Sequence, residues 1–107
     1  MFTAIGIFRR VGINPGPKFA ATFDIDNVQF TLGGIFVSGM PHFSCRHTKL
    51  TYTSLSQLTS TRLIEGSIGP NGLMLRLING PTIEGILEWQ LEAPTVQLIG
   101  CGIWFQT

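Results

Sequence analysis

The stretch TRLIEGSIGPNGLMLRLINGPTIEGILEWQL, residues 61–91, decides the fold class of this chain. Apolar and polar residues alternate along it, and two segments rich in Gly, Pro and Asn interrupt the alternation, so it predicts three strands joined by two turns. In the first turn, Gly69-Pro70-Asn71-Gly72, proline presets a turn dihedral and Asn-Gly tolerates the left-handed backbone region. A four-residue loop there sets the pairs Ile68–Leu73, Gly66–Leu75 and Ile64–Leu77.

The second turn, Asn79-Gly80-Pro81, predicts a three-residue loop that pairs Arg76 with Glu84. A two-residue loop would place the proline in the ladder without an N–H to donate and would move Ile83 to the opposite face. Both turns then agree on one arrangement, whose outer face carries Glu65, Arg76 and Glu84 side by side. Its inner face is predicted to consist of Ile64, Gly66, Ile68, Leu73, Leu75, Leu77, Ile83, Gly85, Leu87 and Trp89.

The rest of the chain predicts further short strands separated by turns, with no convincing helix. Residues 54–60 fit an extended loop, a polar edge strand or one helical turn that uses Leu55 and Leu58. This pattern indicates a single all-β domain, residues 1–107, built as a small antiparallel meander of seven to eight strands. Such a meander forms a barrel or a strongly curved sandwich. Thirteen glycines, several of them inside strands, favour strong curvature and therefore the barrel. In architecture alone, such a barrel resembles the calycin-like proteins, and no sequence motif adds to that resemblance.

Composition excludes several classes of protein. Charged residues make up only 12% of the chain, so uncharged polar residues or a partner must cover much of the surface. The net charge of +1 and the lone pair Arg9-Arg10 argue against nucleic-acid binding. No apolar run approaches the ~20 residues that span a bilayer. Because no export signal is visible and the chain has only two cysteines, Cys45 and Cys101, we expect a cytoplasmic protein with reduced thiols. Secretion remains an alternative if the natural chain has a signal peptide that is missing from this sequence.

A row of glycines on the predicted inner face is the first candidate site. Gly66 and Gly85 flank Leu75, and Gly100 or Gly102 continues the row. Missing side chains there either open space for a small apolar or aromatic ligand or only let the sheet bend. About eight strands are needed before a barrel interior has room for a ligand. The predicted ligand-binding residues are Gly66, Leu75, Leu77, Gly85, Leu87, Trp89 and Trp104.

The charged row on the other face is the second candidate. Exposed to solvent, Glu65, Arg76 and Glu84 would form a cross-strand charge ladder. At the mouth of a pocket, one of the two carboxyl groups would have a raised pKa and act as a general acid or base. The neighbouring apolar residues Met74, Ile78 and Ile86 indicate that another subunit covers part of this face. We assign no catalytic residue.

Two further clusters carry weaker signals. Cys45 and His47 point the same way on a strand and His42 the other, but three ligands at this spacing are too few for a structural zinc site. The sequence therefore predicts a packed cysteine with surface histidines, no metal site and no cofactor. The Ser- and Thr-rich stretch 51–61 with Tyr52 indicates either a solvated loop or a surface that stacks on and hydrogen-bonds a glycan.

Three functions follow from these features. The first is a noncatalytic binding protein that holds a small apolar or aromatic ligand inside its barrel. The second is a homo-oligomeric interaction protein, or a lectin-like protein that binds carbohydrate, because strands 2–8 and 96–105 are apolar on both faces. The third is a small cyclase or isomerase, in which an apolar barrel shapes the substrate and one polar group acts on it.

Overall fold

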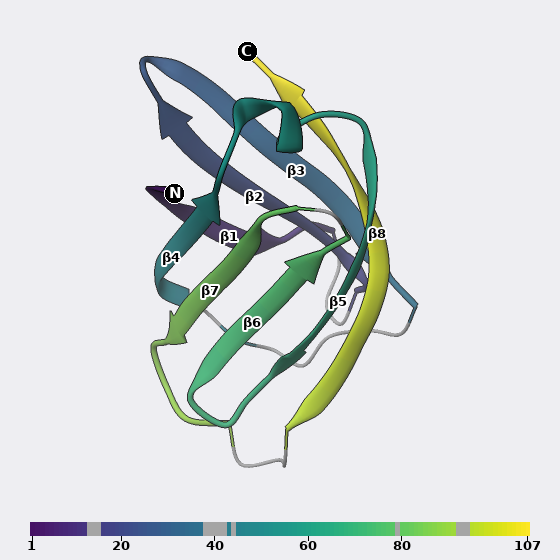
Figure 1. Ribbon diagram of the computed structural model, residues 1–107. Coiled ribbons are helices and arrows are strands. Elements are labelled where there is room, and N and C mark those ends of the chain that lie inside the picture. Colours follow the sequence, from purple (N-terminus) through teal and green to yellow (C-terminus); the bar gives the residue numbers. More distant parts are fainter. Residues whose placement is uncertain (13–15, 38–42, 44, 79, 92–94) are drawn as a thin grey trace.

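The computed structural model describes residues 1–12, 16–37, 43, 45–78, 80–91 and 95–107. These residues form a closed barrel of eight antiparallel strands, which confirms the predicted fold class (Figure 1). None of them forms a helix long and apolar enough to cross a membrane. The strands are β1 (Phe2–Arg10), β2 (Lys18–Ile25), β3 (Val28–Phe36), β4 (Cys45–Tyr52), β5 (Thr61–Ile68), β6 (Gly72–Leu77), β7 (Thr82–Leu87) and β8 (Val96–Gln106).

The strands follow the order β1-β2-β3-β8-β5-β6-β7-β4 around the barrel, and β4 closes onto β1. Two three-stranded meanders, β1–β3 and β5–β7, therefore provide six of the eight strands. The other two, β4 and β8, each lie between the two meanders. Read as halves, the orders β4-β1-β2-β3 and β8-β5-β6-β7 are two successive Greek keys. The barrel thus consists of two similar halves that meet along β7–β4 and along β3–β8.

The barrel interior is filled by inward-facing side chains that form one apolar cluster. The ring of Phe19 stacks between those of Phe8 and Phe36, with centroid distances of 5.1 and 4.7 Å. Leu75 and Ile83 are completely buried. Full burial of each such side chain contributes roughly 1.5–3 kcal/mol to folding, so this cluster is the main source of stability.

The register of the β5–β6 hairpin is the predicted one, with the pairs Ile68–Leu73 and Gly66–Leu75. The predicted β6–β7 register is wrong by two residues, because Arg76 pairs with Thr82 and not with Glu84. An even shift leaves every side chain on its predicted face, so the inner face of these strands is unaffected.

The geometry of the β6–β7 turn explains that shift. The N–H of Leu77 donates to the carbonyl of Pro81 at 3.1 Å, and the N–H of Gly80 donates to the carbonyl of Leu77 at 3.1 Å. Pro81 therefore joins the end of the β6–β7 ladder only as a hydrogen-bond acceptor, through its carbonyl. Because proline has no N–H, the N–H of Gly80 donates to Leu77 in its place. Five residues, 77–81, lie between the last paired positions Arg76 and Thr82, and Asn79 among them lies outside the described residues.

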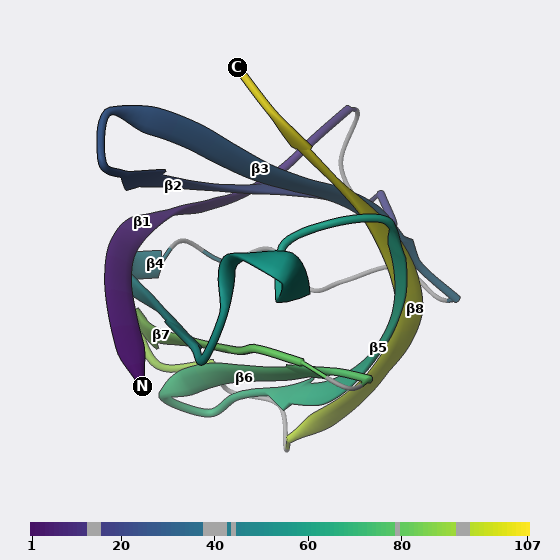
Figure 2. The same cartoon turned by 45° about the horizontal axis from the view of Figure 1, so that its top comes forward.

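The Ser- and Thr-rich segment forms one turn of 3-10 helix, η1 (Leu55–Gln57), which lies across one end of the barrel (Figure 2). Leu58, directly after it, is buried and belongs to the core cluster. The hydroxyl of Ser54 accepts a hydrogen bond from the N–H of Ser56 at 3.2 Å and caps the turn. The segment therefore closes the barrel end, with Leu58 as its apolar plug.

Candidate functional site

The glycine row does not open a cavity at the positions where we predicted one. A Cβ atom added to Gly66 would collide with the backbone carbonyl of Met74, and one added to Gly85 would lie 2.9 Å from the Sγ of Cys45. A Cβ on Gly102 would lie 2.8 Å from the Cδ1 of Leu32. These glycines allow neighbouring strands and side chains to approach closely, as in a strongly curved sheet, which agrees with the alternative prediction that they only let the sheet bend.

The other predicted ligand-binding residues divide into two groups. Leu75, Leu77, Leu87 and Trp104 lie inside the barrel as predicted, but they are packed into the core cluster. The predicted position of Trp89 on the inner face is wrong, because β7 ends at Leu87 and the Trp89 side chain is 45% exposed. The interior of the barrel is therefore a packed core at these positions, and the candidate site must be sought on the outside.

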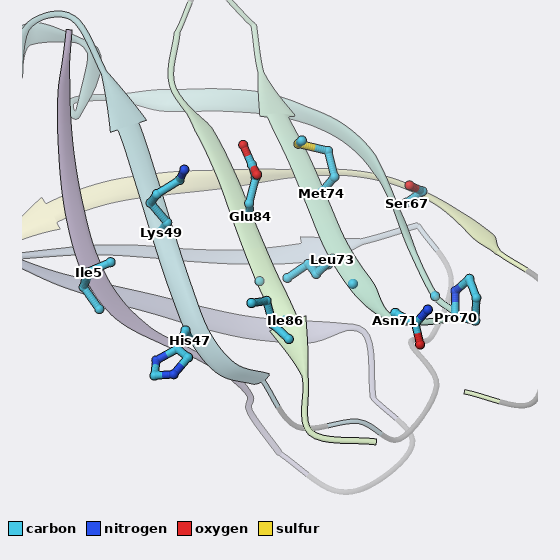
Figure 3. A pocket seen from close by; sticks show the side chains of 13 residues that line it. Ile5, His47, Lys49, Ser67, Pro70, Asn71, Leu73, Met74, Glu84 and Ile86 are labelled. Carbon is cyan, nitrogen blue, oxygen red and sulfur yellow. The ribbon is translucent and has the colours of Figure 1, made fainter. Parts of the chain in front are cut away.

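A hollow on the outer surface provides that site, and we call it the outer groove. It has a volume of about 620 Å³, is open to solvent, and lies over β4, β6 and β7 beside the turn between β5 and β6 (Figure 3). It is within the volume range of small-molecule sites, which is roughly 300–1,000 Å³. Its lining residues are Ile5, His47, Lys49, Ser67, Gly69, Pro70, Asn71, Gly72, Leu73, Met74, Glu84, Gly85 and Ile86.

The hollow arises where small residues replace larger ones on the outward side. Gly72 faces outward beside Ile86, its partner across the β6–β7 ladder. A Cβ on Gly72 would lie 3.1 Å from the carbonyl oxygen of Gly85, so the backbone itself forms the floor here. Ser67, on β5, is the next small outward residue. Figure 3 shows Ile86 rising between the β4 side chains and the turn that contains Pro70.

The walls of the outer groove combine apolar surface with a few polar groups. Ile5, Met74 and Ile86 present exposed apolar side chains. Lys49 and Glu84 are direct partners across the β4–β7 ladder, and Figure 3 shows both side chains pointing away from the barrel. Apolar walls with a few polar groups are typical of sites that orient a small ligand.

The predicted charged row is only partly present. Arg76 and Glu65 are cross-strand partners, with 3.7 Å between the nearest nitrogen and oxygen, and both side chains are about two-thirds exposed. Glu84 does not join them, because the shifted β6–β7 register places it beside Met74 and Lys49 instead. Glu65 and Arg76 therefore form an exposed surface pair, which contributes little to stability, and Glu84 belongs to the outer groove.

The predicted common orientation of Cys45 and His47 is wrong. A register shift between them, a β-bulge in β4, turns Cys45 toward the core and leaves His47 exposed in the outer groove. Burial raises the pKa of the Cys45 thiol to about 11. His42 lies outside the described residues, among which no group of three or more potential metal ligands occurs. Cys45 and Cys101 are both free thiols.

A second outer surface, which we call the β8 face, is apolar. On β8 the side chains of Ile99, Ile103 and Phe105 point outward and are each at least half exposed. Cys101 lies between them and pairs with Ile35 on β3 and with Leu63 on β5. The β8 face consists of Ile35, Val37, Leu63, Ile78, Ile99, Cys101, Ile103 and Phe105.

The predicted glycan surface finds no geometric support. Tyr52 is buried, and its ring stacks on that of Phe2 at 5.5 Å, so it presents no open aromatic face. The hydroxyls of Ser54 and Ser56 hydrogen-bond each other at 2.9 Å, and that of Thr59 donates to the carbonyl of Ser56. These hydroxyl groups hold η1 in place.

Sequence reasoning missed the outer groove because β4 and β7 are neighbours only through the Greek-key order. Ile86 and Met74 were identified as outward-facing apolar residues, but nothing in the sequence indicated that Lys49 and His47 lie beside them. Comparison of the chain with protein-family models, with curated proteins and with solved structures gives no match. Function must therefore be argued from these surfaces alone.

Proposed function

We propose that this protein is a noncatalytic binding module and that its ligand is a small apolar or aromatic molecule. The ligand binds in the outer groove and not in the barrel interior. One observation carries the proposal: a hollow of about 620 Å³ combines the exposed side chains of Ile5, Met74 and Ile86 with the polar groups of Lys49 and Glu84. Apolar walls supply affinity, and the two charged groups select a ligand with hydrogen-bonding groups on one edge.

The position of the charged residues favours binding over catalysis. Lys49 and His47 are exposed, and Glu84 is half-buried at the side of an open groove. Catalytic acids and bases generally work in sites that exclude water, where burial and neighbouring charges tune the pKa to the reaction. A cyclase or isomerase, our third hypothesis, stays a prediction that no feature of the outer groove favours.

The test uses protein-observed NMR with a panel of aromatic and aliphatic fragments on ¹⁵N-labelled protein. We expect fragments to shift the amide signals of Gly72, Glu84 and Ile86. Ile86→Glu places a charge against the apolar wall and should weaken binding at least about tenfold, a loss of roughly 1.4 kcal/mol. The matched control is Ile103→Glu, an outward isoleucine on the β8 face with similar exposure, which should leave binding unchanged. The proposal fails if no fragment shifts these signals or if both variants bind equally well.

Self-association is the second candidate function. It is favoured by the large apolar side chains that several strands expose on the outside of the barrel, in a chain with few charges. Native mass measurement over a range of concentrations tests it, and a strict monomer would exclude it. Carbohydrate binding by residues 51–61 stays a prediction, and a glycan array tests it.

A further inference from the structure

We infer that the β8 face is the surface through which two copies of this chain associate, in a symmetric pair with Cys101 near its centre. The inference rests on the self-association proposed above and specifies which surface and which partner it uses. The face follows from strand register. Ile99, Cys101 and Ile103 alternate along the outside of β8, and Ile35 and Leu63 flank Cys101 from the neighbouring strands.

Backbone hydrogen bonds extend this apolar surface beyond the regular strands. The N–H of Val37 donates to the carbonyl of Ile99 at 2.7 Å, and the N–H of Ile78 donates to the carbonyl of Leu63 at 3.0 Å. Val37 therefore lies beside Ile99 of β8, and Ile78 lies beside Leu63 of β5, so both extend the apolar surface. The β8 face spans β3, β8 and β5, which lie side by side in Figure 1.

The size of the β8 face matches one side of a stable dimer. Its seven large apolar side chains are 43–83% exposed; Ile35 is the least exposed of them and Val37 the most. Together they leave on the order of 800 Å² uncovered, which is about the area that each partner contributes to an interface of standard size. An exposed apolar surface of this extent is unusual for a monomer and marks a contact surface.

Charge favours a second copy over other partners. Glu65, directly beside Ile99, forms its ion pair with Arg76 at the edge of the face. On the opposite edge, the exposed Lys18 of β2 lies directly beside Ile35. The two edges therefore carry both signs of charge, so that each can face an opposite charge across a two-fold axis. A lipid surface would instead favour a fringe of unpaired Lys and Arg residues around the apolar centre.

The test compares two outward isoleucines of similar exposure by analytical ultracentrifugation. Ile99→Glu places a charge in the middle of the β8 face and should weaken the dimer about 100-fold or more, because an unpaired carboxylate would be buried. Ile7→Glu, on the outside of β1, is 67% exposed against 62% for Ile99 and should leave the dimer intact. Circular dichroism checks that both variants fold, and we expect them to do so because both positions lie on the surface.

A second measurement locates the centre of the interface. In a Cys45→Ser background, only Cys101 can react with N-ethylmaleimide. We expect Cys101 to react several-fold more slowly at concentrations where the dimer forms than in the dilute monomer. The Ile99→Glu variant should lose this protection, because its Cys101 remains at a free surface.

The outcomes that would contradict this inference can be told apart from those that would contradict self-association. A wild-type monomer at all concentrations overturns both this inference and self-association. A dimer that survives Ile99→Glu, or that leaves Cys101 reactive, overturns the β8 face and leaves self-association standing. A monomer that binds phosphatidylcholine vesicles and loses that binding with Ile99→Glu assigns the face to lipid instead.

Discussion

The close packing at Gly66 gives a direct test of the filled barrel interior. In Gly66→Ala, the added Cβ runs into the carbonyl of Met74 and comes within 2.9 Å of the Cα of Leu75. Both are backbone atoms, so the clash is relieved only by moving β5 and β6 apart. Overpacking of this kind costs roughly 1–3 kcal/mol, and the reduced entropy of the unfolded chain returns about 0.4–1 kcal/mol. We expect a net loss of about 1–2 kcal/mol.

Gly33→Ala is the matched control, because its Cβ would meet only the ring of Phe105, at an ordinary 3.5 Å. We expect it to be neutral or stabilising by up to about 1 kcal/mol. Urea unfolding followed by tryptophan fluorescence measures both variants, and the midpoint of Gly66→Ala should be clearly the lower. If Gly66→Ala is as stable as the wild-type protein, β5 and β6 leave free space beside Leu75, and an interior ligand becomes possible again.

Three further variants test other parts of the structure. Leu58→Ala removes the plug at the η1 end of the barrel and should cost about 2–5 kcal/mol in urea unfolding, whereas a loss below 1 kcal/mol would place η1 outside the folded unit. Glu65→Gln breaks an exposed pair with Arg76 and should change stability by less than about 0.5 kcal/mol. Because burial raises the pKa of Cys45 from the ordinary 9.0 to about 11, the unfolded chain ionises first and stability should fall as pH rises from about 9 to about 11. In Cys45→Ser that fall should be smaller, and equal falls would contradict the raised pKa.

Local signals in the sequence were sufficient for the strands and for one hairpin. The alternation puts Ala4 and Phe8 on one face of β1 and Ile5 and Ile7 on the other, and the structure shows that the first pair is buried and the second exposed. The Gly-Pro-Asn-Gly turn sets the β5–β6 register without ambiguity. Both signals act between residues that are close in the chain, where turn geometry and side-chain alternation dominate.

The detailed geometry of one turn, a β-bulge and a contact between distant strands were not predictable. The β6–β7 register depends on Gly80 supplying the N–H that Pro81 lacks, a detail that turn composition does not reveal. The bulge in β4 reverses Cys45 relative to His47, although a regular strand would place them on one face. The outer groove needs β4 beside β7, and this contact exists only because the chain forms two Greek keys. Local sequence carries no signal for such pairings.

The contrast between β4 and β8 is the main reason to treat the β8 face as a contact surface. The two strands occupy equivalent places in the two Greek keys, each between the two meanders. On its outer side β4 carries His47 and Lys49, as a solvent-facing strand should, whereas β8 carries Ile99 and Ile103. Closing the barrel requires only inward-facing apolar residues, so the apolar outer side of β8 adds nothing to the core. Exposed apolar surface lowers solubility, so we infer that the outward-facing apolar side chains of β8 contact a partner.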